Sequence, residues 1–321
     1  MVEMIRIRNF KSIKDISLEC GKINVLIGEP NTGKSNILEV LGFLSSLKHG
    51  SLVKFVRLNK VTELFNDFNI YEDIEIDYGD LKLTASMNDG LIVNLIKEGE
   101  KNQVASIGID TGSYVLNRPE LFEKIRFYKF KVPDKYEINK VDYLTPPFGS
   151  NLPSIIQTRQ EIKEFVADLF RNFNYKMSID KLGSEMALVA DTPSILTLIP
   201  YNIVSDTLQR MVFYVCVILS NRDAVIALNE PETNVFPYYT KTLAEMIALD
   251  DQGNQYFVST HNPYFLLSLI EKVKKEDLRV IITYVEDNVT QVKALREEEI
   301  EEIMEHGVDP FFNLSRYIEN K

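Results

Sequence analysis

The segment Gly28–Ser35 has the residue types and spacing of a phosphate-binding loop. Its sequence, GEPNTGKS, matches the pattern G-x-x-x-x-G-K-[ST], in which glycines let backbone N–H groups turn toward phosphate oxygens. In such a loop the lysine, here Lys34, reaches the β and γ phosphates, and the hydroxyl, here Ser35, binds Mg²⁺. The other predicted members of this nucleotide-binding loop are Gly28, Glu29, Pro30, Asn31, Thr32 and Gly33.

The sequence on either side of the loop predicts a strand before it and a helix after it. Residues 23–27 form a short apolar run, and apolar residues between 37 and 47 recur at helical spacing. This strand–loop–helix order is the context that the pattern requires. The positive end of the predicted helix adds to the attraction for phosphate.

Two later strands are predicted to end in polar groups that could act on a bound nucleotide. The apolar run 224–228 leads into Asn229 and Glu230, and the run 256–259 leads into His261. Ligands of parallel sheets bind at the carboxyl ends of the strands, and we expect strand 224–228 to lie beside the strand before the loop. There Asn229 could accept a hydrogen bond from a Mg²⁺-bound water, Glu230 could deprotonate the attacking water, and His261 would face the γ-phosphate.

The order of the predicted elements indicates an α/β fold of the P-loop NTPase class. From residue 205 onward helices and strands alternate, which indicates a mostly parallel core sheet flanked by helices. Residues 70–96 read as an antiparallel meander. We predict one domain over residues 1–321, with a mainly antiparallel β insertion at 50–150 and a helical region at 155–220.

Composition limits the choice of partners. The 321 residues carry a net charge of −11, which disfavours a generally basic surface that coats nucleic acid. A local basic stripe remains at 124–131, where lysines and arginine interleave with aromatic residues that could stack on bases; the alternative is a strand with one core face. The longest apolar run, 211–219, is too short to cross a bilayer, and the two cysteines read as buried thiols. We therefore expect a soluble, cytoplasmic protein without a membrane partner.

The chain resembles ABC-type ATPase heads of the group that includes SMC heads, RecF and the OLD-family nucleases. The resemblance is carried by residues 7–13, 27–39, 228–232 and 259–263. It implies ATP and Mg²⁺ as ligands and a homodimer that closes face to face around two ATP molecules. It also implies that Glu230 is the catalytic carboxylate, that His261 is the switch histidine, and that three further residues join the nucleotide site, namely Lys11, Ser12 and Asn36.

The resemblance extends to a signature segment that acts in trans, and here the chain departs from the family. The matching residues are Ser205, Asp206 and Thr207, and Ser205 would contact the partner's ATP. Thr207 replaces the family's glycine, and Asn229 replaces the aspartate that supports Mg²⁺. The family also has a glutamine that contacts Mg²⁺, for which Gln157 is the best candidate. These departures favour slow turnover or an ATP-gated dimer switch.

The resemblance suggests a switch in DNA maintenance or anti-phage defence that works with a separate effector chain, a nuclease or a toxin. DNA or RNA binding is left open. One alternative is a non-hydrolysing, ATP-binding scaffold. Another, which the opening at residues 9–12 disfavours, is the ATPase subunit of a transporter.

Overall fold

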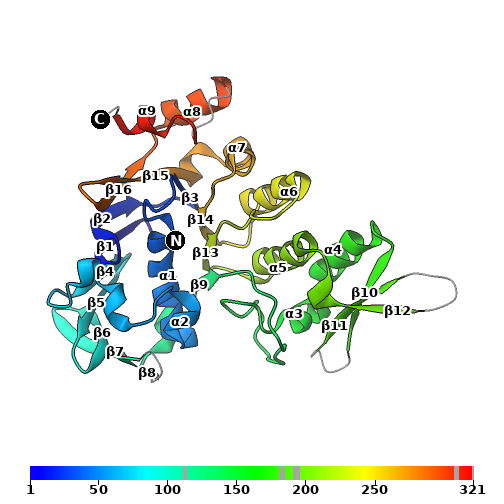
Figure 1. Ribbon diagram of the computed structural model, residues 1–321, viewed down its shortest axis with the longest axis horizontal. Coiled ribbons are helices and arrows are strands. Elements are labelled where there is room, and N and C mark those ends of the chain that lie inside the picture. The colour runs from blue at the N-terminus through cyan, green and yellow to red at the C-terminus, as the bar shows by residue number, and fades with distance from the viewer. Residues whose placement is uncertain (111–113, 181–184, 191–195, 307–310, 320–321) are drawn as a thin grey trace.

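The computed structural model describes residues 1–110, 114–180, 185–190, 196–306 and 311–319. Three sheets organise these residues, with seven, six and three strands. In Figure 1 the seven-stranded sheet lies at the lower left, the six-stranded sheet runs through the centre, and the three-stranded sheet lies at the right.

The central sheet has the strand order β16-β15-β3-β14-β13-β9. All neighbours from β15 to β9 run parallel, and β16 pairs antiparallel with β15. The bounds are β3 Ile23–Gly28, β9 Ile125–Tyr128, β13 Val225–Asn229, β14 Gln255–Ser259, β15 Leu278–Glu286 and β16 Val289–Ala294. The predicted α/β class with a mostly parallel core sheet is confirmed.

Both faces of this sheet are covered, which explains why its strands read as continuous apolar runs. Successive residues point into two different cores: Val25 packs on the side of the helices that lie between residues 152 and 272, and Leu26 packs on the side of the helix Lys34–His49. The first of these cores also holds Val258, and the second holds Phe257. The sheet is therefore a rigid platform on which strand ends can position side chains.

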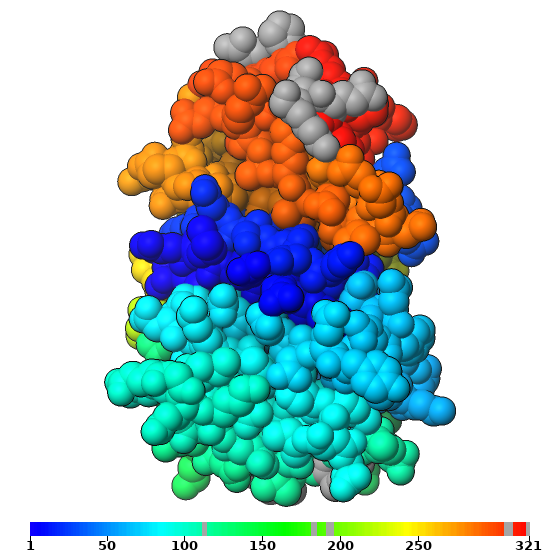
Figure 2. All heavy atoms as spheres, turned by 90° about the vertical axis from the view of Figure 1, so that its left-hand side faces the viewer, coloured from blue at the N-terminus to red at the C-terminus, as the bar shows by residue number. Residues whose placement is uncertain are grey.

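Helix α1 (Lys34–His49) packs between the central sheet and the antiparallel sheet. The antiparallel sheet has the order β2-β1-β4-β5-β6-β7-β8. Figure 2 shows the N-terminal residues, in dark blue, as a band between the later strands of this sheet, in cyan, and the C-terminal part of the chain, in orange. Its strands are β1 Met4–Phe10, β2 Ile13–Glu19, β4 Ile74–Tyr78, β5 Leu81–Met87, β6 Gly90–Lys97, β7 Glu100–Gly108 and β8 Tyr114–Leu116. The meander predicted at 70–96 is present.

The other face of the central sheet is covered by helices that continue into the three-stranded sheet (Figure 1). These helices are α3 Leu152–Thr158, α4 Gln160–Arg171, α5 Asp206–Ser220, α6 Pro237–Ala248 and α7 Pro263–Lys272. The strands of this sheet are β10 Tyr175–Ile179, β11 Met186–Ala190 and β12 Thr197–Pro200. The remaining α-helices are α2 Leu52–Phe55, α8 Glu297–His306 and α9 Leu314–Glu319. Short 3₁₀ turns lie at Val61–Leu64, Asn66–Phe68, Pro119–Phe122, Tyr201–Ile203 and Lys275–Asp277.

Two expectations about strand placement are wrong. The strand that ends at Asn229 is not the neighbour of β3, because β14 lies between them and pairs with both. All five residues of β14 are buried, and such a strand is most stable at the centre of a sheet. Strand β9, which lies within the predicted insertion at 50–150, is instead the parallel edge strand of the core.

Candidate functional site

The loop between β3 and α1 has the backbone geometry of a phosphate cradle. Gly28 has φ +150° and Gly33 has φ +102°, both in the region that favours glycine. A Cβ on Gly28 would lie 2.3 Å from the Thr283 carbonyl oxygen, and one on Gly33 would lie 2.4 Å from Thr290 Oγ1. Asn31 adopts φ +63° between them. The loop is thus held tightly against β15 and β16, at the N-terminus of α1.

Lys34 lies inside the loop and is buried. Its ammonium donates to the carbonyl oxygens of Gly28 at 2.8 Å and Glu29 at 2.7 Å. Burial lowers the pKa of Lys34 to about 8, although the nearby Glu230 and Glu29 carboxylates act in the opposite direction. With this pKa the ammonium is still mostly charged at pH 7, and a negative ligand beside it would stabilise the charged form, so the residue is suited to phosphate.

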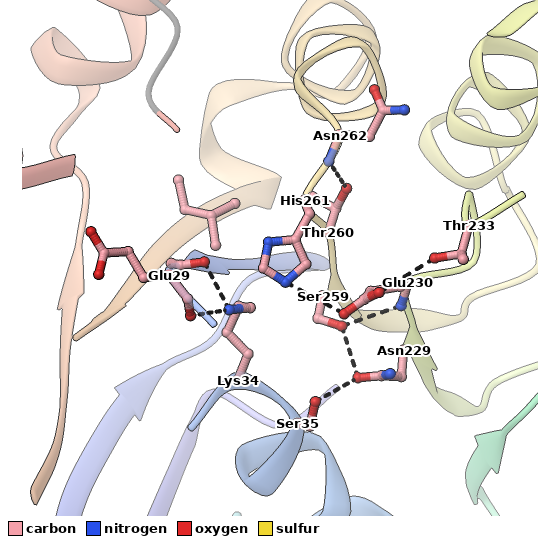
Figure 3. A network of polar contacts seen from close by, with 12 residues as sticks. Glu29, Lys34, Ser35, Asn229, Glu230, Thr233, Ser259, Thr260, His261 and Asn262 are labelled. Carbon is pink, nitrogen blue, oxygen red and sulfur yellow. Dashed lines mark hydrogen bonds and ion pairs between the residues drawn. The ribbon is translucent and has the colours of Figure 1, made fainter. Parts of the chain in front are cut away.

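The ends of two strands, β13 and β14, meet the first turn of α1 through hydroxyl hydrogen bonds (Figure 3). Asn229 Oδ1 accepts from Ser35 Oγ at 3.1 Å and from Ser259 Oγ at 3.0 Å. Because β14 lies between β3 and β13, Ser259 is the register partner of Leu26 on one side and of Asn229 on the other. Ser259 was not predicted as a site residue, although it directly precedes the Thr260-His261 pair.

Glu230 and His261 lie together at the opening of this network. His261 Nε2 is 3.4 Å from Glu230 Oε1, and Thr233 Oγ1 donates to Glu230 Oε2 at 3.3 Å. Burial and then the Lys34 ammonium lower the pKa of His261, against the effect of Glu230. The imidazole is therefore neutral at pH 7, and its contact with Glu230 is not a full ion pair. The structure brings both predicted catalytic residues to the loop.

Glu232 is a buried carboxyl group that the sequence analysis missed. Its Oε1 accepts from Thr260 Oγ1 at 2.5 Å and from the His261 N–H at 3.3 Å. Its Oε2 is buried and has no hydrogen-bond partner among the described residues. Burial raises the pKa of Glu232 to about 7. The side chain positions the His261 segment from behind, and no sequence pattern distinguished it from an exposed turn residue.

Two cavities meet at Ser35, Arg57 and Glu230. The phosphate cavity, of about 300 Å³, is lined in addition by Pro30, Asn31, Gly33, Lys34, Asn36 and His261. The Asn229 cavity, of about 330 Å³, lies on the other side of Ser35 and is lined in addition by Glu39, Phe127, Lys129, Phe130, Arg210, Tyr214, Asn229 and Thr233. Arg57 and Lys129 are therefore candidate site residues that the motifs did not reveal.

Of the three residues added by the family resemblance, Asn36 lines the phosphate cavity and Ser12 supports it. The Asn36 amide donates to Ser12 Oγ at 2.7 Å, and Ser12 Oγ is also 2.7 Å from Thr290 Oγ1. Lys11 does not line either cavity. The Lys11 ammonium donates to Glu39 Oε2 and to the Arg57 carbonyl oxygen. Lys11 therefore stabilises the wall of the cavity and does not face a ligand.

Gln157 is not brought to the loop. Helix α3 buries Leu152, Pro153, Ile155 and Ile156 against the core, which leaves position 157 exposed. The Gln157 amide donates to the Asp180 carbonyl at 3.3 Å, and the side chain lines a separate cavity with residues of α4 and β10. The structure therefore gives no support to a magnesium role for Gln157.

The predicted signature residues begin helix α5. Ser205 is the N-cap residue, and its side chain makes no capping hydrogen bond. Asp206 pairs with Arg210 at 2.7 Å, and Thr207 Oγ1 donates to the Asn234 carbonyl at 2.9 Å. An apolar cavity of about 630 Å³ lies beside Ser205 and Thr207. The segment is thus tied to the loop that follows Glu232, and none of its three residues lines the phosphate cavity.

The basic and aromatic stripe at 124–131 does not form a surface for bases. Phe127 and Tyr128 are fully buried in the two cores. Arg126 is also buried, donates to Asn221 Oδ1, and lies 3.3 Å from the centroid of the Tyr143 ring. The proposed stacking on aromatic side chains is therefore wrong, because β9 belongs to the core sheet and is covered on both faces.

The donors beside Ser35 fit a Mg²⁺ ion that arrives with nucleotide. Ser35 Oγ and Asn229 Oδ1 are hard oxygen ligands, and Mg²⁺ commonly takes few protein oxygens together with phosphates and water. Neither oxygen carries a charge. Among the described residues no group of three or more His, Cys, Asp or Glu side chains could hold a metal alone. The phosphates would therefore have to supply the negative charge.

Comparison with known proteins agrees with this geometry. A model for "AAA ATPase domain" matches residues 1–181, and a second, "AAA domain, putative AbiEii toxin, Type IV TA system", matches residues 111–268. The chain belongs to the AAA ATPase domain family. With the loop and strand ends described above, it is an ATPase of this family.

Curated relatives and solved structures extend the comparison. An ATP/GTP phosphatase of Helicobacter pylori is 21% identical over 86% of this chain and 90% of its own length. An uncharacterized protein of Methanocaldococcus jannaschii, MJECL10, is 45% identical over 16% of this chain and only 23% of its own length.

Among solved structures, an Smc head bound to the C-terminal winged-helix domain of ScpA has a TM-score of 0.53 at 14% identity. That match covers 92% of this chain and 98% of the other. The Smc head with an extended coiled coil bound to the C-terminal domain of ScpA, derived from Pyrococcus furiosus, has a TM-score of 0.52 at 12% identity and covers 95% and 98%. These matches show the fold. No helix in the described part of the chain is long and apolar enough to span a membrane.

Proposed function

We propose that this ATPase hydrolyses ATP slowly as part of a dimeric switch, with Glu230 as the base that activates water. The observation that carries the proposal is the single network that joins Ser35, Asn229 and Ser259 beside Glu230 and His261. It places a carboxylate, a neutral imidazole and the loop lysine around one cavity. Such groups can orient a water and stabilise a phosphoryl group in transfer.

The backbone of Glu230 supports this role. Its φ of +49° lies in the left-handed region, which costs a non-glycine residue roughly 1–2 kcal/mol. The Glu230 N–H is held by the Ser259 carbonyl at 3.1 Å and by Ser259 Oγ at 3.2 Å. Strain held in this way at a candidate active site is consistent with a side chain that must face the ligand.

Dimerisation on ATP supplies the second half of the proposed site. Ser205 would contact the nucleotide of the partner copy, and Mg²⁺ would be held between Ser35, Asn229 and the phosphates. The family description that names a toxin–antitoxin system and the likeness to Smc heads support a role in defence or DNA maintenance beside a separate effector chain.

A non-hydrolysing scaffold is the second candidate, and Asn229 favours it. An amide in place of a carboxylate gives the ion a weaker neighbour, and changes around a metal's ligands commonly cost roughly 10- to 100-fold in affinity or activity.

Phosphate release from Mg-ATP at several protein concentrations, for the chain and for Glu230→Gln, tests the proposal. We expect specific activity to rise with protein concentration and to vanish in Glu230→Gln, while Glu271→Gln, an exposed carboxylate on α7, keeps it. Specific activity that is independent of concentration would contradict the dimer. If the unaltered chain and both variants bind ATP but none of the three releases phosphate, the non-hydrolysing scaffold would be established.

A further inference from the structure

Lys129 lies at the same edge of the central sheet as Asn229. Strand β9 runs parallel to β13, and Tyr128 is the register partner of Leu228, so the residues that follow them are neighbours. The Lys129 N–H donates to the Pro147 carbonyl at 2.9 Å, which fixes the backbone at this point. The side chain lines the Asn229 cavity together with Ser35 and Glu230.

The Lys129 ammonium is the cation of this cavity that has no carboxylate partner among the described residues. The other two cations are paired, Arg57 with Glu39 at 2.7 Å and Arg210 with Asp206 at 2.7 Å. The second oxygen of Glu39 is taken by Lys11 at 2.5 Å. The Lys129 ammonium instead lies 5.3 Å from the centroid of the Phe127 ring.

This arrangement favours the binding of an anion beside Lys129. Lys129 is half-buried, and burial lowers its pKa although Glu39 acts in the opposite direction. A partly desolvated ammonium without a counter-ion loses part of its hydration, and a negative group can replace it. Asn229 does not supply that charge, whereas an aspartate at the same position would.

The cavity's geometry identifies the anion. The Asn229 cavity shares Ser35, Arg57 and Glu230 with the phosphate cavity, so an anion seated beyond Ser35 reaches Lys129. The phosphate chain of a bound nucleotide is the group that enters from the loop side.

We propose that Lys129 neutralises the terminal phosphates of bound ATP from the Asn229 side, opposite Lys34. This proposal rests on the proposed function, since it requires ATP in the phosphate cavity. An ammonium at this place does part of the charge neutralisation that a magnesium ion supplies when bound. Nucleotide binding should therefore depend only weakly on Mg²⁺, and the neutral Asn229 beside it leaves Lys129 free for phosphate.

The test is calorimetric titration of ATP into the full chain and its variants, once with saturating Mg²⁺ and once with EDTA. We expect removal of Mg²⁺ to weaken ATP binding only a few-fold for the unaltered chain. For Lys129→Gln it should weaken binding at least about tenfold more, the loss expected for one hydrogen bond to a charged group. Lys129→Arg keeps the charge and should behave like the unaltered chain.

Lys131→Gln is the matched control. Lys131 lies two residues after Lys129 and is exposed, and its replacement removes the same charge. If the unaltered chain binds and hydrolyses ATP, and Lys129→Gln shows the same Mg²⁺ dependence of ATP binding, the inference about Lys129 is overturned and the proposed function stands. An unaltered chain that binds no ATP under either condition would overturn the proposed function as well. Unfolding midpoints of all variants identify any that fail to fold. If Lys129→Gln does not fold, the comparison of Lys129→Arg with the unaltered chain decides.

Discussion

The two cavities that meet at Ser35 are built in different ways. The phosphate cavity is formed mainly by one continuous segment, whose shape is set by backbone groups and glycine conformations. The Asn229 cavity is assembled from α1, the end of β9, α5 and the end of β13, and charged side chains define it. Phosphate affinity is therefore a local property of the chain, whereas the chemistry next to it depends on the topology of the sheet.

Replacement of Lys34 by alanine is the strongest test of this division. If the phosphate cavity carries the affinity, Lys34→Ala should weaken ATP binding on the order of 1,000-fold, since about two charge-assisted hydrogen bonds are lost. Calorimetric titration measures this directly. Lys48→Ala, in the last turn of the same helix, removes an equal charge and should bind ATP normally. Binding that survives in Lys34→Ala would show that the Asn229 cavity contributes most of the affinity.

The same division explains what could be predicted from the sequence. The loop and the polar ends of β13 and β14 could be predicted, because each depends on a short run of residues. The insertion of β14 between β3 and β13 could not, since strand order depends on the whole set of crossovers. For the same reason Ser259 was missed, and Lys129 and Arg126 appeared to belong to one surface stripe although one lines a cavity and the other is buried.

Gln157 and Glu232 show a second limit of sequence reasoning. Gln157 was chosen by residue type, but its helix turns that position away from the core. Glu232 follows Glu230 by two residues, and nothing in the sequence indicates that one carboxyl is half-buried and the other buried. Burial is set by packing against distant segments, which a single sequence does not display.

Glu232, which holds the His261 segment from behind, adds a pH dependence that the loop backbone cannot supply. Burial raises the pKa of Glu232 to about 7, above an ordinary value of 4.5. The stability from this group is therefore fully present below about pH 4.5 and is lost as the pH rises through about 7. Between pH 5 and pH 8 the loss should be roughly 2 to 3 kcal/mol in the free energy of unfolding.

Urea unfolding at pH 5 and pH 8 measures this difference. In Glu232→Gln the loss attributed to the carboxyl should disappear, because the amide does not ionise. Glu271→Gln, on an exposed position of α7, should retain the full pH dependence. An equal pH dependence in Glu232→Gln and the unaltered chain would mean that another group is responsible. The Glu232 carboxyl would then be hydrated in the folded protein.

The substitution Asn229→Asp tests whether a carboxylate gives the Asn229 cavity a stronger attraction for Mg²⁺. A carboxylate at this position would lie beside Ser35 Oγ, which is 3.1 Å from the present amide oxygen, and would attract Mg²⁺. We expect the Mg²⁺ concentration that gives half-maximal turnover to fall about tenfold, and turnover itself to rise. Asn88→Asp, in the exposed turn between β5 and β6, adds the same charge far from the site and should change neither. If Asn229→Asp leaves the Mg²⁺ requirement unchanged, the new carboxylate has paired with Lys129 instead, and the Asn229 cavity is governed by that lysine rather than by the metal.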